Sequence, residues 1–151
     1  MKRSERMQTV ERVVNDVERK KAEALAARER FVTECETKLS ELESYQKSYA
    51  DQFQTRAGAG IGAAGLRDFQ TFMVRLGDAV KQQAQIVEKA RADRDAERKL
   101  WQNAAQRADA VGGLVERWQK DEQREGDRQA QRESDERAQR PTLQALQVRG
   151  S

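Results

Sequence analysis

The sequence predicts an all-α fold in which two long helices form an antiparallel coiled-coil hairpin. The prediction rests on a charge-rich composition, two tracts with an apolar heptad repeat, and a glycine-rich stretch between these tracts. Of the 151 residues, 36% are apolar, 5% are aromatic and 36% are charged. Such a composition cannot fill a broad globular core, but it suits helices that each bury one narrow face.

The first heptad tract covers residues 7–53. Apolar side chains recur there at alternating steps of three and four residues, which is typical of a coiled coil. Basic residues interrupt the row, and a second apolar row broadens it on one side, so its buried face is loosely defined. The predicted stripe contains Met7, Val10, Val14, Val17, Ala24, Phe31, Cys35, Leu42, Tyr45 and Tyr49, and the flanking row contains Leu25, Val32, Leu39 and Phe53.

The second tract has a more regular repeat. Most of its heptad positions are apolar, and sustained heptads indicate a helix that supercoils around a partner. The predicted stripe contains Met73, Leu76, Val80, Gln83, Val87, Ala90, Arg94, Glu97, Trp101, Ala104, Ala108, Val111, Val115 and Trp118.

The glycine-rich stretch at residues 54–65 is predicted to be the turn of the hairpin. A narrow apolar face is buried only against another such face, so the chain is expected to reverse here. A reversal centred near residue 61 would place Phe31 beside Ala90, Cys35 beside Val87, Leu42 beside Val80 and Val17 near Ala104.

The same stretch contains Gly60, Gly62 and Gly65 in a G-x-G-x-x-G pattern. This pattern indicates a dinucleotide site when a buried strand precedes it and a helix follows. Here a predicted helix precedes it, so the glycines are interpreted as a turn and no cofactor is expected.

We predict two regions along the chain: a coiled coil at residues 1–118 and a charged extension at residues 119–151. Charged side chains dominate residues 119–140, where alanines are the only apolar residues. Such a segment forms either a solvated helix or a disordered tail. Pro141 is expected to end any helix there.

Composition also limits the function. The chain has no histidine, and its single cysteine, Cys35, is expected to be a small buried thiol in a reducing compartment. We therefore expect no enzymatic activity and no metal site. The segment MKRSERMQTVERVV lacks the apolar core of a signal peptide, and no long apolar run follows, so a cytoplasmic protein without membrane insertion is expected.

Two segments resemble the flagellar export protein FliJ family. ELESYQKSYADQF ends the first tract with L-x-x-Y-x-x-x-Y, and LRDFQTFMVRLGDAVKQQ opens the second with F-x-x-F-x-x-x-L-x-x-A. The resemblance implies an antiparallel coiled coil similar in shape to the central stalk of rotary ATPases. It also implies a location in the bacterial cytoplasm at the flagellar base, peripheral to the inner membrane.

The partners implied by the resemblance belong to the flagellar type III export apparatus. Family members insert their free helix ends into the hexameric export ATPase FliI and promote its assembly, contact the export gate protein FlhA, and escort export chaperones. The resemblance assigns gate contact to Leu42, Tyr45, Tyr49, Phe72, Leu76 and Ala79, and it places polar side chains at the positions of Lys38 and Gln83. For ATPase-ring contact, the free ends offer Lys2, Arg3, Arg6, Arg12 and Trp118.

Other functions remain open at the level of sequence. The nearest alternative is the homologous stalk of a virulence injectisome, and another is a generic coiled-coil chaperone or dimeric scaffold; we expect a monomer when the protein is alone. Nucleic-acid binding is disfavoured, because the pI of about 9.2 accompanies a net charge of only +3. A chaperone or scaffold would bind its clients without needing Tyr45, Tyr49 or Phe72, which distinguishes it from the stalk.

Overall fold

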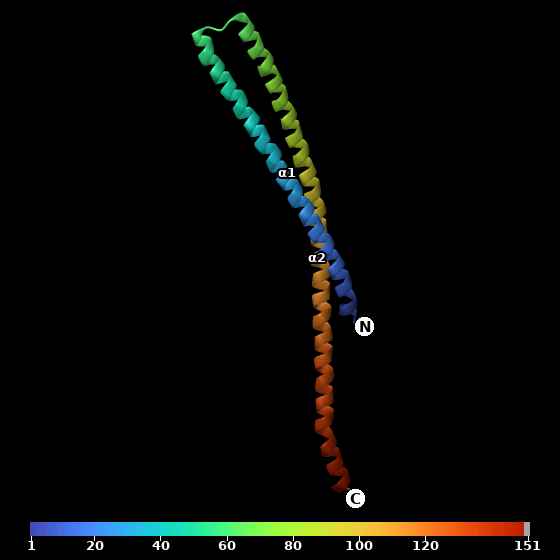
Figure 1. Ribbon diagram of the computed structural model, residues 1–151. Helices are drawn as coiled ribbons and strands as arrows, with labels where there is room; N and C mark the ends of the chain where they lie inside the picture. The colour runs from blue at the N-terminus through green and yellow to red at the C-terminus, as the bar shows by residue number, and fades with distance from the viewer. Residues whose placement is uncertain (150–151) are drawn as a thin grey trace. The chain divides into compact units, whose positions relative to one another are not determined.

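The computed structural model describes residues 1–149, with side chains described through residue 140. These described residues form two helices, α1 at Arg3–Ala59 and α2 at Ala63–Arg149 (Figure 1). The chain divides into two compact units, one formed by residues 1–17 and 105–151 and the other by residues 18–104. Each helix contributes to both units.

Residues 18–104 form an antiparallel helical hairpin, as the sequence predicts (Figure 1). The reversal is shorter than the expected 54–65, because α1 continues to Ala59 and α2 begins at Ala63. Gly60 has a φ of 93°, a left-handed conformation that side chains disfavour. The amide of Leu66 donates to the carbonyl of Gly62 at 3.1 Å, which begins the hydrogen bonding of α2.

The core of this hairpin is a cluster of small and medium side chains. Val32 and Cys35 from α1 pack with Val87 and Ala90 from α2, and the half-buried Leu39 packs against them. Cys35 is therefore the buried free thiol that the sequence predicts. The packing of Cys35 with Val87 also confirms the expected register at this level of the hairpin.

The apolar stripe of α2 is confirmed along its length. Every predicted position from Met73 to Trp118 is buried or half-buried, including the polar ones. Gln83, only 5% exposed, donates a hydrogen bond from Nε2 to the carbonyl oxygen of Cys35 at 3.0 Å. Trp101 donates from Nε1 to Glu18 at 2.8 Å. These bonds satisfy polar groups that would otherwise be costly to bury.

The predicted stripe of α1 is wrong at several positions. Phe31 is 46% exposed, whereas its neighbour Val32 is 3% exposed and occupies the core. Adjacent helical residues point about 100° apart, and the buried face of α1 lies between the two predicted rows: it combines Cys35 of the stripe with Val32 and Leu39 of the flanking row. Ala90 was expected to pair with Phe31, but in the structure it packs with Val32. Three other members of the predicted stripe are also exposed, namely Val10, Val17 and Tyr45.

In the other unit, residues 3–17 of α1 lie beside α2. Ala108 and Val115 of α2 are buried there. Beyond Glu122, no described part of α1 covers α2, and residues 123–140 are all exposed. The predicted division of the chain at residue 118 stays a prediction, and the last two residues of the predicted extension lie outside the described part of the chain.

Pro141 does not end α2, contrary to the sequence-based expectation. The helix continues to Arg149. A proline removes one backbone donor and crowds the carbonyl four residues earlier, at a cost of about 3 kcal/mol, but it does not forbid helical geometry on either side. Neither helix, within the described residues, has an apolar stretch long enough to cross a membrane.

Candidate functional site

Three aromatic residues near the turn form a continuous cluster, here called the aromatic cluster: Tyr45 and Tyr49 from α1, and Phe72 from α2. The ring centroid of Tyr49 lies 4.8 Å from that of Tyr45 and 4.6 Å from that of Phe72. These separations are within the range of favourable aromatic contacts. Tyr49 therefore connects two predicted gate-contact residues that lie on different helices.

The outer members of the aromatic cluster face solvent. Tyr45 is 51% exposed and Phe72 is 37% exposed, whereas Tyr49 is half-buried between them. The Tyr45 hydroxyl donates to the Tyr49 hydroxyl at 3.4 Å. This bond, together with the proximity of the second phenol, raises the pKa of Tyr45 above its usual value. The phenol is neutral near pH 7 even without this shift. An exposed, uncharged aromatic surface of this kind suits the centre of a protein interface.

The other predicted gate-contact residues have different environments. Leu76 is 7% exposed and belongs to the core, so it offers little surface to a partner. Leu42 and Ala79 are half-buried. At the two further positions that the family pattern marks as polar, Lys38 is exposed, but Gln83 is committed to its bond with Cys35.

Sequence reasoning missed two aromatic residues as site components. Phe53 and Phe69 stack across the helices with centroids 3.8 Å apart and planes 9° from parallel. They line a groove of about 370 Å³ that shares Tyr49 and Phe72 with the aromatic cluster, here called the tip groove. The repeated aromatic spacing was a usable signal, since Phe53 lies four residues after Tyr49. The groove is lined by Tyr49, Gln52, Phe53, Arg56, Ile61, Gly65, Asp68, Phe69 and Phe72.

Ile61 of the turn and Gly65 of the first turn of α2 both line the tip groove. The side chain of Ile61 lies so close to Gly65 that a Cβ at residue 65 would meet its Cγ2 at 2.8 Å. Glycine at residue 65 therefore lets Ile61 pack against the first turn of α2. The G-x-G-x-x-G pattern thus has a structural use here, and the sequence-based interpretation as a turn agrees with the structure for Gly60 and Gly62, whereas Gly65 lies in α2.

The second candidate site lies where α1 begins, in the unit formed by residues 1–17 and 105–151. The guanidinium of Arg3 sits over the ring of Trp118, 3.9 Å from the centroid, in cation–π geometry. The structure thus brings together two of the residues predicted for ATPase-ring contact. Lys2, Arg6 and Arg12 are exposed and are not drawn into this contact.

Glu122 caps the start of α1, a role that sequence reasoning missed. Its carboxylate accepts hydrogen bonds from the Ser4 amide at 3.2 Å and from the Ser4 hydroxyl. The first amides of a helix have no partner within the helix and carry partial positive charge, so a carboxylate is well placed there. The heptad spacing offered a signal, because Glu122 follows Trp118 by one step of four.

These contacts lower the pKa of Glu122 below 4.5, chiefly through the hydrogen bond from the Ser4 hydroxyl, with support from the Ser4 amide and the charges of Lys2 and Arg3. A lowered folded-state pKa means that the contact stabilises above the unfolded-state pKa and is lost as pH falls through the folded-state value. We therefore expect the start of α1 to loosen progressively as the pH falls below 4.5.

Amide hydrogen exchange measured by NMR during acid titration from about pH 6 tests this expectation, with intrinsic exchange rates subtracted. Protection of the Ser4 amide should fall with acidification in the wild type. Glu122→Gln keeps the side-chain size and an acceptor oxygen but cannot ionise, so its Ser4 protection should be lower than that of the wild type near pH 6 and should not change with pH. A wild type whose Ser4 protection is constant until the whole protein unfolds would contradict the capping role.

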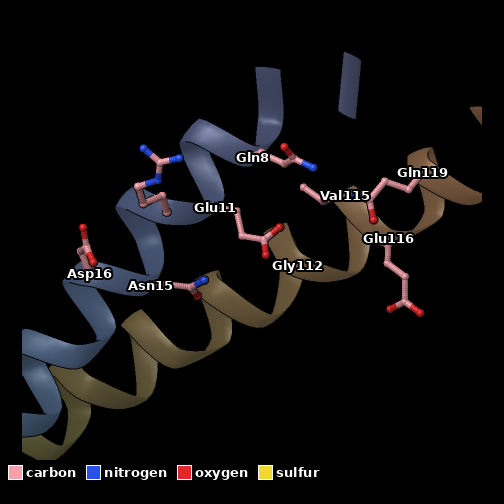
Figure 2. Close-up of a pocket in the computed structure, with 9 residues that line it drawn as sticks. Gln8, Glu11, Asn15, Asp16, Gly112, Val115, Glu116 and Gln119 are labelled. Carbon is pink, nitrogen blue, oxygen red and sulfur yellow. The ribbon is translucent and has the colours of Figure 1, made fainter. Parts of the chain in front are cut away.

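A polar groove of about 590 Å³ lies between the helices in the same unit (Figure 2). Gln8, Glu11 and Asn15 approach it from α1, and Gly112 leaves room on the opposite wall. A Cβ added at Gly112 would meet no other atom within 4 Å, so this space is open. Amides and carboxylates dominate the lining, which therefore suits polar partner groups. The remaining lining residues are Arg12, Asp16, Val115, Glu116 and Gln119.

A protein-family model described as the flagellar FliJ protein matches residues 2–146. The chain belongs to the flagellar FliJ protein family. Neither the curated proteins nor the solved structures contain a significant match to it.

Membership of the FliJ family gives the chain a role related to flagellar type III export. The match covers both helices, including the aromatic cluster near the turn and the start of α1. The exposed groups at both candidate sites are aromatic rings, amides and solvated charges.

Proposed function

We propose that this FliJ-family protein is the stalk and adaptor of the flagellar export ATPase. Its free helix ends insert into the FliI hexamer and promote assembly of the ring, and its turn end contacts the export gate protein FlhA. It also escorts export chaperones. The protein acts in the bacterial cytoplasm at the flagellar base, and ATP hydrolysis belongs to its partner.

The observation that carries this proposal is the exposed aromatic cluster beside the turn. Tyr45 and Phe72 are held in place by Tyr49, so they need little further ordering before they bind. Aromatic side chains that are ordered in the free protein favour binding, because fewer rotamers are lost in the complex. These residues are among those that the family resemblance assigns to gate contact.

The free ends support insertion into a ring in a different way. Arg3 on Trp118 and Ser4 on Glu122 hold the start of α1 against α2, so the first turn of α1 is fixed rather than frayed. An element that transmits force between partners needs such fixed ends, because a loose terminus would absorb displacement. Lys2, Arg6 and Arg12 then offer exposed charges to the surrounding protein.

A hydrolysis assay tests the proposed function. Adding the purified protein to its cognate export ATPase should raise the rate of ATP hydrolysis and increase the hexamer fraction, because the stalk stabilises the assembled ring. At each protein concentration, the hydrolysis rate is measured by phosphate release, and the hexamer fraction is measured by light scattering. If neither hydrolysis nor ring assembly changed at saturating protein, the stalk function would be wrong and a chaperone or scaffold function would be favoured.

A further inference from the structure

Both helices of the hairpin carry an exposed apolar row beside the buried core. Positions seven residues apart return to nearly the same side of a helix, so Phe31 and Tyr45 lie in one line on α1, and so do Phe72 and Ile86 on α2. These four side chains are between 37% and 51% exposed. The two rows together, here called the outer face, contain Phe31, Lys38, Tyr45, Phe72, Ala79 and Ile86.

The two rows lie on the same side of the hairpin. Phe31 of α1 and Ile86 of α2 line one groove of about 260 Å³. Nearer the turn, the ring of Tyr49 contacts both Tyr45 and Phe72. The outer face therefore extends across both helices, and along each helix it covers two heptads, or roughly 20 Å.

Charged residues of opposite sign border the outer face. Four positions after the row of α1 lies the core, for example at Cys35, so the residues three positions after the row point to the other side of it. On α1 these residues include Glu34 and Glu41, here called the acidic rim. On α2 they include Arg75 and Lys89, here called the basic rim. All four rim residues are exposed.

We propose that the outer face binds a second copy of this chain, so that two hairpins pack face to face with their turns at the same end. A twofold axis parallel to the helices places α1 of each copy against α2 of the other, so each acidic rim meets a basic rim. With the turns at opposite ends, α1 would instead lie against α1, and the two acidic rims would repel. Charge complementarity thus identifies both the occupant and its orientation.

A second copy fits the outer face better than a single helix of another protein does. A foreign helix would need its own heptad row, with basic side chains on one flank and acidic side chains on the other, whereas a second copy supplies all three by symmetry. Lys38 interrupts the row of α1, but its long side chain can bury its methylene groups and extend its ammonium towards Glu34 or Glu41, one turn before and after it.

The basic rim remains available to the partner copy. Lys89 pairs with Asp93 at 3.1 Å, but the Lys89 side chain is 79% exposed. An exposed pair of this kind contributes little, typically below about 1 kcal/mol, so Lys89 can turn to a carboxylate of the second copy at small cost.

The dimer is expected to be weak, because the outer face is short and its side chains are already partly covered within the hairpin. We expect a Kd on the order of 100 µM, so monomers prevail at low micromolar concentration. The dimer would cover Tyr45 and Phe72, so a dimeric protein could not contact the gate through the aromatic cluster. This consequence rests on the proposed function, whereas the dimer itself does not.

Sedimentation equilibrium of the full-length protein between about 5 and 500 µM tests the dimer. The dimer fraction of the wild type should rise with concentration. Ile86→Asp should raise the Kd of the dimer at least about tenfold, because the new carboxylate would be buried between the copies without a partner. Val74→Asp is the matched control: Val74 is a 66% exposed aliphatic residue of α2 that lies off the outer face, so this variant should dimerise as the wild type does.

Charge reversal of the rims tests the orientation. Glu34→Lys with Glu41→Lys reverses the acidic rim, and Arg75→Glu with Lys89→Glu reverses the basic rim. Each variant alone brings like charges together and should dimerise about tenfold more weakly, whereas an equimolar mixture restores opposite charges at both contacts and should dimerise as the wild type does. The comparison is made at about 150 mM salt, which screens the long-range effect of net charge.

Circular dichroism checks that every variant keeps its helicity. A wild type that stays monomeric at about 500 µM, or equal weakening by Ile86→Asp and Val74→Asp, would overturn the inference and leave the outer face to another protein. A mixture of the two rim variants that dimerises no better than each variant alone would overturn the pairing of α1 with α2 across the dimer. Stimulation of the ATPase by the wild type is measured separately, so the stalk function stands or falls independently of these results.

Discussion

Replacing Val87 with aspartate is expected to lower the free energy of unfolding of the hairpin by about 3 kcal/mol or more. Val87 is 2% exposed and packs against Val32, Cys35 and Ala90. None of these side chains can pair with a carboxylate, so the introduced acid would either stay uncharged or force the two helices apart. Urea denaturation followed by circular dichroism measures the change.

Val74→Asp is the matched control, since it makes the same substitution on the same helix. Val74 is 66% exposed, so the new carboxylate stays solvated and the free energy of unfolding should change by less than about 0.5 kcal/mol. Equal destabilisation in both variants would show that the helix itself, rather than the contact between helices, responds to the charge. Unchanged stability in Val87→Asp would contradict the observed core.

Replacing Tyr45 or Phe72 with alanine is expected to weaken binding to the cytoplasmic part of FlhA by about 2 kcal/mol, or roughly thirtyfold. Each ring is at least one-third exposed, and both contact Tyr49. Truncation removes aromatic contact area from the interface but leaves the buried Leu76 in place. Binding should be measured by isothermal titration calorimetry, and melting should be measured for each variant.

Phe31→Ala serves as the control for an exposed aromatic residue outside the aromatic cluster. Phe31 is 46% exposed, so its removal should leave gate binding unchanged. A large fall in melting temperature for Tyr45→Ala or Phe72→Ala would mean that these residues are part of the core. If Phe31→Ala weakened gate binding as much as Tyr45→Ala or Phe72→Ala does, the aromatic cluster would not be a specific contact site.

Sequence reasoning predicted α2 better than α1 because the heptad repeat of α2 is regular. Its stripe can be followed in steps of three and four along the whole tract, so the buried face followed directly from spacing. In α1, Phe31 and Val32 are adjacent and both apolar. Spacing alone cannot choose between two neighbouring rows.

The candidate site was predictable in part. The tyrosines and phenylalanine of the aromatic cluster were identified from their motif, but their mutual contact depends on the register of α1 against α2. The stacking of Phe53 on Phe69 and the bond from Ser4 to Glu122 join different helices. No local pattern specifies such pairs, because each depends on which faces the helices present to one another.

Composition, helix breakers and heptad spacing are local properties, and they were enough to establish that this protein is helical, that the chain reverses at its glycines, and which face of α2 is buried. The packing of the two helices was needed to establish the buried face of α1, the short turn at residues 60–62 and the capping of α1 by Glu122. These features depend on the fit between two surfaces. A narrow helix face gains its burial only from its partner, so the partner selects the row that fits.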